Sequence, residues 1–303
     1  MMKTAPVTVR TPASTSNCGA GFDTLGIALS LYNFVRVQAV DTPGVRYVGD
    51  DPMPKRSLEM VAEAAERFWR LHDLDPHGLE FDIWGEVPIA RGLGSSATLR
   101  AGISAGLNTI HGELLDRPAL TAFCCDLDHS PDNSVPLVNG GFCIARVDPE
   151  TGAYCYGLSH PVSEAVRFVV VSPENRVLTE AARAVLPAEL GLADAVRSIN
   201  SVAAVVSIFA SGEYPLLRNA VSDFIHQPYR EKLNPFMKET ISAGVAAGAW
   251  CGWLSGSGSS ILCVCPEEAT SEVGQAMQGI FEQQRMESRL YFLKADNAGL
   301  ALV

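Results

Sequence analysis

Residues 88–97, "PIARGLGSSA", place two glycines and two serines directly before a segment with small and apolar residues at helical spacing. The preceding residues 78–87, "GLEFDIWGEV", alternate as a strand does. A glycine turn between a strand and a helix presents unpaired backbone N–H groups, which together with the helix dipole favour a phosphate. No lysine follows the second glycine, so this is not the Walker P-loop. A plain turn whose serines cap the helix is the alternative.

The length and composition indicate a folded protein with either two packed domains or one large α/β body. The chain has 303 residues, of which 47% are apolar and 19% charged. Its formal charge of −11 disfavours nucleic acid and anionic membranes as partners, although arginines can still gather in one pocket for a small anion. The eight cysteines are spread through apolar runs without the usual zinc spacing, which favours reduced, buried thiols.

The N-terminus has no apolar core of signal-peptide length, and no apolar run approaches the roughly 18 residues of a membrane span. We therefore expect a cytoplasmic protein.

Strands and helices are both expected along the whole chain. Strands are predicted at 6–12, 33–40, 78–87, 140–147, 167–173 and 288–295, and helices at 57–72, from 95 onward, 189–211, 235–246 and 266–283. Two further strands flank the glycine-rich turn at 256–260. No internal repeat is found, and a domain boundary is expected near 155–165, giving domains 1–160 and 161–303.

Five motifs in order resemble those of the homoserine kinases, a family of GHMP small-molecule kinases. "PIARGLGSSAT" is similar to the GHMP nucleotide loop, and "PASTSNCGAGFDTLGIAL" (12–29) to the homoserine kinase opening, with Cys18 and Ala20 in place of leucine and proline. "ENRVLTEAARAVLP", "DFIHQPYR" and "AWCGWLSGSGSSILCV" match later segments. The resemblance covers nearly the full length.

The resemblance implies an α+β fold in two domains. The N-terminal GHMP nucleotide-binding domain is expected to be like domain 2 of ribosomal protein S5, with a left-handed crossover, and the C-terminal GHMP domain to be ferredoxin-like. The implied reaction is ATP-dependent phosphorylation of the side-chain hydroxyl of L-homoserine to O-phosphohomoserine, a step of threonine biosynthesis, in a homodimer.

The implied nucleotide site is the loop itself. Backbone amides there would hold the phosphates of ATP, since positioning and charge neutralisation supply most of the acceleration in phosphoryl transfer. The residues are Pro88, Arg91, Gly92, Leu93, Gly94, Ser95, Ser96 and Ala97. Mg²⁺ would be held by Ser96 and by Asp128, which replaces the family's glutamate at the start of the segment "DHSPDN".

The implied acceptor site pairs opposite charges with a zwitterionic amino acid. Asp23 suits its ammonium group, and two guanidinium groups suit its carboxylate through paired hydrogen bonds. Asn17 and Asn133 would orient the hydroxyl, and Asp132 is a conceivable base. The expected substrate-binding set is Asn17, Asp23, Asn133, Thr179, Arg183 and Arg230, with Asn133, Asp132 and Arg183 as the catalytic residues.

Each of these residues also has a structural interpretation. Asp23 could cap a following helix, Arg183 could form a surface ion pair, and Asn133 could bond its own backbone in a turn. Arg230 and His226 could simply pack between helices, and residues 256–260 could be only a turn.

The sequence also departs from the family pattern. His129 and Ser130 replace a glycine and a histidine, and Ser57 or Glu59 stands where an asparagine associated with adenine is usual. A kinase for another hydroxylated amino acid, or a ligand-binding homologue without catalysis, therefore remain the alternatives.

Overall fold

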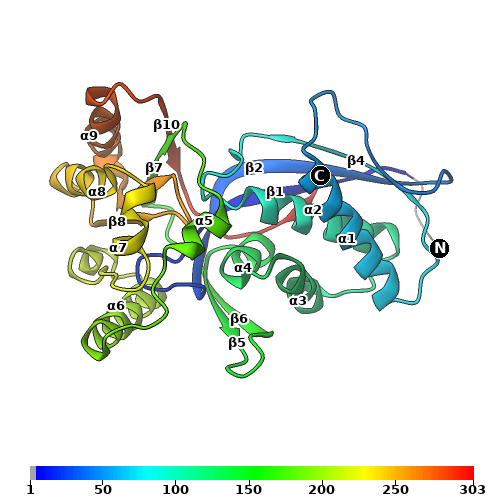
Figure 1. Ribbon diagram of the computed structural model, residues 1–303, viewed down its shortest axis with the longest axis horizontal. Coiled ribbons are helices and arrows are strands. Elements are labelled where there is room, and N and C mark those ends of the chain that lie inside the picture. The colour runs from blue at the N-terminus through cyan, green and yellow to red at the C-terminus, as the bar shows by residue number, and fades with distance from the viewer. Residues whose placement is uncertain (1–4) are drawn as a thin grey trace.

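The computed structural model describes residues 5–303, which form two β-sheets with their helices side by side (Figure 1). In that view the half built mainly from the first part of the chain lies to the right, and the half containing β7 to β10 lies to the left. The short helix α5 (Thr179–Ala184) lies between the two halves. A site formed where the halves meet can therefore draw on both parts of the sequence.

The first sheet has seven strands. Its main path is β11-β1-β2-β4-β3, and β5 pairs with β2 and with β6; β3 and β4 are parallel, and the other pairs are antiparallel. The strands are β1 (Val7–Ser16), β2 (Leu25–Val40), β3 (Val45–Tyr47), β4 (Gly78–Gly85), β5 (Phe142–Val147), β6 (Tyr154–His160) and β11 (Ala301–Leu302). Its helices are α1 (Lys55–Leu71), α2 (Ser95–Ile110), α3 (Arg117–Asp128) and α4 (Pro131–Asn139).

Two glycines bring α2 unusually close to β2. A Cβ on Gly102 would lie 2.4 Å from a methyl group of Val35, and one on Gly106 would lie 2.6 Å from a methyl group of Val37. The two glycines are four residues apart and share one helix face, while the two valines alternate onto one face of the sheet. This close packing fixes where α2 begins, and so fixes the glycine loop before it.

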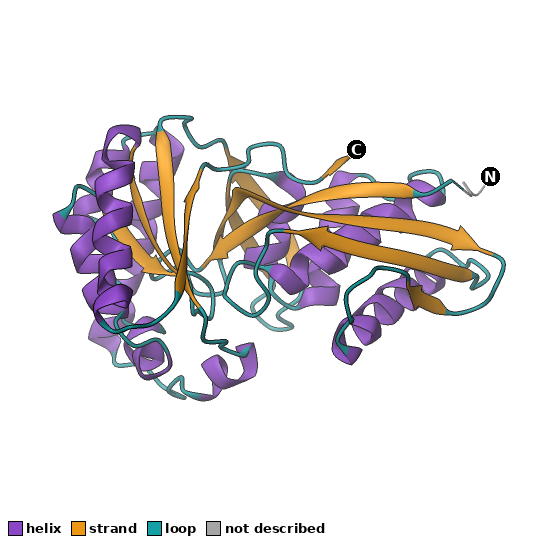
Figure 2. Cartoon of the chain, turned by 90° about the horizontal axis from the view of Figure 1, so that it is seen from above, coloured by secondary structure: helices purple, strands orange, loops and turns teal. Residues whose placement is uncertain are grey.

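The second sheet has four antiparallel strands in the order β10-β7-β9-β8. The strands are β7 (Val166–Pro173), β8 (Cys251–Leu254), β9 (Ile261–Pro266) and β10 (Ser288–Leu293), and the helices α8 (Met237–Ala246) and α9 (Thr270–Gln283) pack against them. The four strands and the two helices packed against them follow the order β7-α8-β8-β9-α9-β10, which is the ferredoxin-like sequence of elements; residues 174–236, which contain α5 and the two α-helices after it, are inserted between β7 and α8. Figure 2 shows the helices beside this sheet and the long strands of the first sheet leading away from it. The two-domain GHMP-like α+β prediction is confirmed.

Most predicted elements are present, with shifted ends. The segment expected from 189 begins its helix, α6 (Leu192–Ser211), three residues later, and β2 starts at Leu25, eight residues before the predicted strand. The sequence patterns did not predict β3, β6, β11, α3, α4, α5 or α7 (Gln227–Arg230), nor the 3₁₀ helices Tyr214–Asn219, Glu231–Leu233 and Glu267–Ala269. All eight cysteines are free thiols, and seven are buried.

The C-terminal tail ties the two sheets together. After β10 the chain crosses back, and β11 pairs with β1 at the edge of the first sheet. Asp296 accepts a hydrogen bond from the hydroxyl of Tyr32 at 2.9 Å on the way. Earlier in the chain, β6 of the first sheet ends at His160, and β7 of the second sheet begins at Val166. A division at residue 160 stays a prediction.

Candidate active site

The glycine loop ends in an open helix N-terminus. Gly94 is the N-cap of α2, with a left-handed φ of 73°, and no side chain caps the helix. The first N–H groups of a helix have no partner within it, so they remain available to an anion. The alternative of a turn capped by its serines is therefore wrong.

Both loop glycines are needed because other parts of the chain come very close to them. A Cβ on Gly92 would lie 2.0 Å from the carbonyl oxygen of Ser255, and one on Gly94 would lie 2.2 Å from the hydroxyl of Ser14. The Ser255 hydroxyl donates to the Gly92 carbonyl at 2.7 Å, and the Ser14 N–H donates to the Leu93 carbonyl at 3.2 Å. The loop is thus held between β1 and the turn that joins β8 to β9.

The segment between β1 and β2 forms a second loop, the acceptor loop, residues 17–23. Asn17 is buried with a φ of 72°, and its side chain accepts from the N–H of Asp23 at 3.1 Å and donates to the Gly256 carbonyl at 3.1 Å. β2 follows at Leu25, so the alternative that Asp23 caps a helix is wrong. Asn17 therefore joins the acceptor loop to the same turn that holds the glycine loop.

Asp23 and Arg183 bond to each other across the two halves of the molecule. The Arg183 guanidinium donates two hydrogen bonds to the Asp23 carboxylate, at 3.0 Å and 2.9 Å. This hydrogen bonding raises the pKa of Arg183. Thr179 lies four residues earlier, at the exposed start of α5 and on the same helix face. The two charges expected at opposite ends of an acceptor thus lie side by side.

Arg230 approaches the acceptor loop from the end of α7 and is buried. Its side chain donates to the carbonyl oxygens of Ala182 and Gly256 at 3.1 Å and 3.0 Å, and its guanidinium lies 5.2 Å from the ring centre of Phe22. Burial, with the charge of Arg183 next in importance, lowers its pKa to about 10. It nevertheless keeps its charge at neutral pH.

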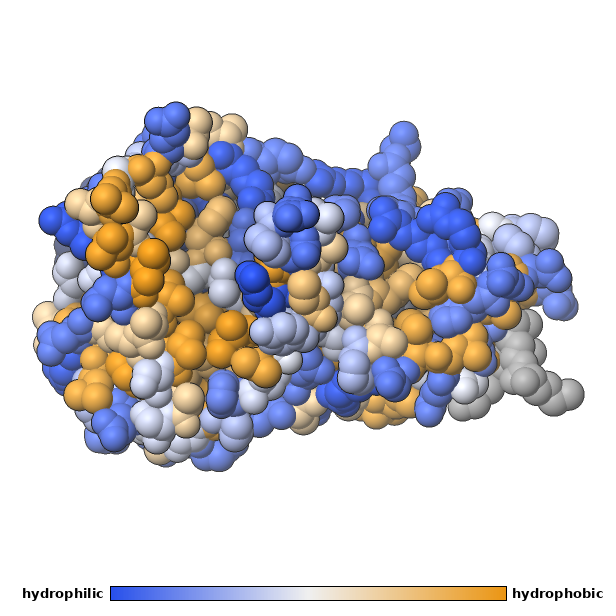
Figure 3. Space-filling model, turned by 90° about the horizontal axis from the view of Figure 1, so that it is seen from below, coloured by the Kyte–Doolittle hydropathy of each residue, from blue (hydrophilic) through white to orange (hydrophobic). Residues whose placement is uncertain are grey.

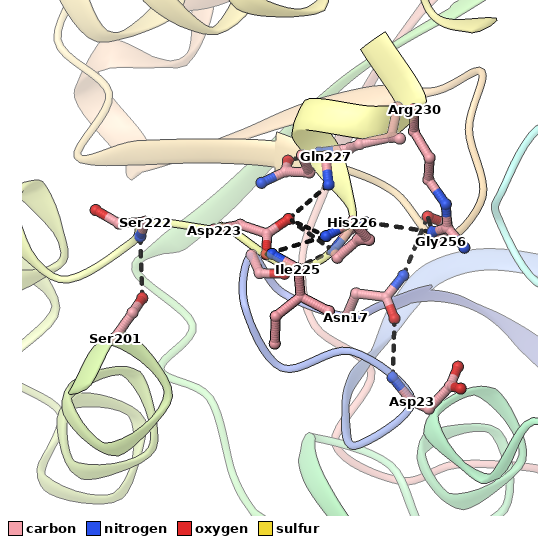
Figure 4. Close-up of polar contacts among 12 residues, drawn as sticks. Asn17, Asp23, Ser201, Ser222, Asp223, Ile225, His226, Gln227, Arg230 and Gly256 are labelled. Atoms are coloured by element: carbon pink, nitrogen blue, oxygen red, sulfur yellow. Dashed lines mark hydrogen bonds and ion pairs between the residues drawn. The ribbon is translucent and has the colours of Figure 1, made fainter. Parts of the chain in front are cut away.

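A buried histidine links Arg230 to the acceptor loop (Figure 4). The Nδ1 atom of His226 lies 3.3 Å from a guanidinium nitrogen of Arg230, and its Nε2 lies 2.8 Å from the Gly19 carbonyl oxygen. A guanidinium only donates, so Nδ1 accepts and Nε2 carries the proton. Burial lowers the pKa of His226, so the ring is neutral at neutral pH. The carboxylate of Asp223, 3.3 Å from Nε2, accepts the N–H groups of Ile225 and Gln227.

The residues at the start of α4 face the glycine loop. The side chain of Asn133 accepts from the Ser14 hydroxyl at 2.8 Å and donates to the Ser16 hydroxyl at 3.2 Å, so the alternative that it bonds its own backbone is wrong. Asp132 is only 3% exposed. Burial, and then the nearby charge of Asp23, raises the pKa of Asp132 to about 7.

Asp128, the predicted metal ligand, is engaged by another side chain. Its carboxylate accepts from Arg100 on α2 at 2.7 Å, with the two side chains 6% and 17% exposed. His129 follows with a left-handed φ of 53° as the C-cap of α3, which explains why a glycine suits that position in the family pattern.

Several residues of the site were not predicted. Ser14, Ser16 and Arg100 bond the side chains of predicted residues, whereas Ser255 bonds the backbone of the glycine loop and Asp223 the backbone of residues 225–227. Some of these contacts join residues up to 163 positions apart in sequence, so periodicity could not reveal them. The motifs contain the other four residues but not Arg100.

The fold and the loop define a GHMP-type small-molecule kinase. The family model for the GHMP kinase N-terminal domain matches residues 57–141, and that for the C-terminal domain matches residues 207–283. A homoserine kinase from Clostridium beijerinckii is 34% identical over 301 residues, covering 98% of both chains, and one from Moorella thermoacetica is 33% identical over 297 residues, covering 97% and 99%.

The chain belongs to the homoserine kinase family. The crystal structure of homoserine kinase from Cytophaga hutchinsonii superimposes with a TM-score of 0.90 at 27% identity, covering 100% of this chain and 98% of that one. Mevalonate diphosphate decarboxylase from Staphylococcus aureus shares the fold, with a TM-score of 0.74 at 13% identity, covering 100% and 98%. The fold alone therefore does not decide the acceptor.

Proposed function

We propose that this protein transfers the γ-phosphoryl group of ATP to the side-chain hydroxyl of L-homoserine, forming O-phosphohomoserine for threonine biosynthesis. Family membership supports this proposal, and one structural observation carries it. The turn after β8 contacts the acceptor loop and the glycine loop at the same time. The Gly256 carbonyl accepts from both Asn17 and Arg230, and the neighbouring Ser255 bonds Gly92 of the nucleotide loop. The proposed acceptor and nucleotide sites thus adjoin.

An amino acid acceptor would be held by its two charged ends. Its ammonium group would pair with Asp23, and its carboxylate with Arg183 and Arg230. Binding would exchange the internal Asp23–Arg183 pair for two pairs with the acceptor, which keeps the charges balanced. Only an acceptor with both charges gains both pairs, and this selects amino acids over simple alcohols.

The reaction needs an aligned hydroxyl and a place for its proton. The hydroxyl oxygen bonds to the γ-phosphorus, the bond from that phosphorus to the ADP oxygen breaks, and the hydroxyl proton leaves. Asn133, held by Ser14 and Ser16, would orient the hydroxyl. Asp132, whose pKa of about 7 lies close to neutral pH, would accept the proton.

The phosphates would lie on the N–H groups of Gly92 to Ala97, and Mg²⁺ would use oxygen ligands nearby. Ser96 in the first turn of α2 and the Asp128 carboxylate provide the hydroxyl and carboxylate oxygens that Mg²⁺ prefers. Within residues 5–303 no three His, Cys, Asp or Glu side chains group to hold a metal. Mg²⁺ would take its remaining ligands from phosphates and water, as it commonly does. When bound, the ion neutralises charge on the transferring group.

We also propose a cytoplasmic homodimer in which α6 lies at the interface. Leu192, Val196 and Ile199 follow one helix face and are 81%, 55% and 67% exposed. Figure 3, which views the molecule from below, shows apolar side chains gathered at its left end, the end where Figure 1 places α6. Within the described chain, α6 is also the one helix that is apolar and long enough to span a membrane. A single helix of this kind is weak evidence for a membrane protein. Light scattering should give twice the chain mass, and Ile199→Asp should give the monomer; an Ile199→Asp dimer would exclude this interface.

ADP release with Mg-ATP across L-homoserine, L-threonine, L-serine and amino alcohols tests the proposed reaction. Turnover with homoserine alone is the expected result. Ser130 in place of the family's histidine favours, as a second candidate, a kinase for another hydroxylated amino acid, and turnover confined to another acceptor would establish it. Melting shifts with ligand but no turnover would identify a ligand-binding homologue instead.

A further inference from the structure

The proposed metal carboxylate carries its own counter-ion. Arg100 donates to Asp128 at 2.7 Å, and both side chains are largely shielded from solvent. Asp128 ends α3, whereas Arg100 lies in the second turn of α2, so the pair also joins two helices. An ion pair with this burial is far less screened than one on the surface.

Arg100 also lies on the same face of α2 as the phosphate-binding turn. It follows Ser96 by four residues, which places it about 6 Å further along the helix axis and on one side with it. Ser96 and Asp128 are the two side chains proposed for Mg²⁺. The positively charged Arg100 thus lies beside the two side chains to which Mg²⁺ would bind.

The guanidinium group of Arg100 is not fully occupied. Its Nε is buried and has no hydrogen-bond partner among residues 5–303. The contact with Asp128 is through Nη1 and Oδ1. Within the described part of the chain, the guanidinium group thus keeps an unpaired buried donor, and its one hydrogen bond to a side chain is the one to Asp128.

We propose that Arg100 is a positioning residue that competes with Mg²⁺ for Asp128 and thereby lowers the preference of this protein for Mg-nucleotide over free nucleotide. The like charges of the guanidinium and the metal ion repel each other, and the bond from Arg100 to Oδ1 reduces the negative charge that the carboxylate offers to the ion. Removing the charge of Arg100 frees Asp128 for the ion. This inference rests on the proposed kinase function, because it takes Asp128 as facing the metal.

The test measures the Kd of ADP by calorimetry in excess Mg²⁺ and in excess EDTA. The Kd in EDTA divided by the Kd in Mg²⁺ is the preference ratio, which rises as Mg-ADP is bound more tightly than free ADP. Arg100→Gln removes the charge but keeps an N–H donor for the buried Asp128, so the variant can still fold. It should raise the preference for Mg-ADP on the order of tenfold, in the range of ordinary coupling between two sites. Arg100→Lys keeps the charge and should leave the ratio near that of the wild type.

Two further variants complete the design. Arg46→Met removes an exposed arginine that pairs with Glu80 on the first sheet, and it should leave the ratio unchanged. The double variant Arg100→Gln with Asp128→Asn should lose the tenfold gain, because the carboxylate that bonds the ion is gone.

An unchanged or lower ratio in Arg100→Gln would overturn the proposal, as would an equal gain in Arg46→Met or in the double variant. Melting in EDTA verifies that each variant is folded. If ADP binds in neither buffer, the kinase proposal itself fails; if ADP binds in both and the ratio ignores Arg100, only the role of Arg100 fails.

Discussion

Replacing Asp132 with asparagine removes a carboxyl group that the fold buries almost completely. The pKa of Asp132 is about 7 in the folded protein, against 3.8 for an ordinary aspartate, because burial and the charge of Asp23 oppose ionisation. Between these two pH values the folded state binds more protons than the unfolded chain. The free energy of unfolding contributed by this group therefore falls as the pH rises from about 4 to about 7.

The size of the effect follows from the two pKa values. Their difference of roughly 3 pH units corresponds to about 4 kcal/mol, since each unit is worth about 1.4 kcal/mol. Asparagine keeps the shape and the hydrogen-bonding capacity but carries no charge. Asp132→Asn should thus unfold with a similar free energy to the wild type near pH 4 and be more stable by up to about 4 kcal/mol at pH 8.

Urea unfolding of both proteins at several pH values between 4 and 8 measures this difference. Asp126→Asn, which neutralises an exposed aspartate on α3, is the matched control and should show no such trend. In the wild type, turnover should rise with pH through about 7, because the proposed base must be ionised, and Asp132→Asn should lose this dependence. A stability difference that does not vary with pH would refute the reasoning.

Three other substitutions test the remaining parts of the site. Gly94→Ala places a side chain at a left-handed φ and 2.2 Å from the Ser14 hydroxyl; it should cost at least about 1–2 kcal/mol in urea unfolding and weaken ADP binding in calorimetry, and unchanged values would contradict the close approach. His226→Asn should raise KM for the acceptor about tenfold with little change in KM for ATP, because the ring positions Arg230; an equal rise in both would argue for general unfolding. Asp128→Asn should reduce turnover far more than homoserine binding, and equal losses in kinetics and calorimetry would count against its metal role.

Local patterns along the chain predicted most of its strands and helices, and the resemblance of its motifs to a known family predicted the class of fold and the candidate site residues. Alternation and helical spacing predicted the strand β4 before the glycine loop and the helix α2 after it, because these periods depend only on which side of an element is buried. The motifs also predicted the residues of both loops, because close backbone approach and phosphate binding need glycine at particular positions.

Only the tertiary structure decided which of those residues contact one another. Asp23 and Arg183 are 160 residues apart, and their pairing depends on how the two sheets meet. The bond between Arg100 and Asp128 depends likewise on the packing of α2 against α3, so neither helix alone indicated it. Sequence periodicity specifies the buried face of each element, whereas the distances between side chains on different elements follow from the packing of the whole chain.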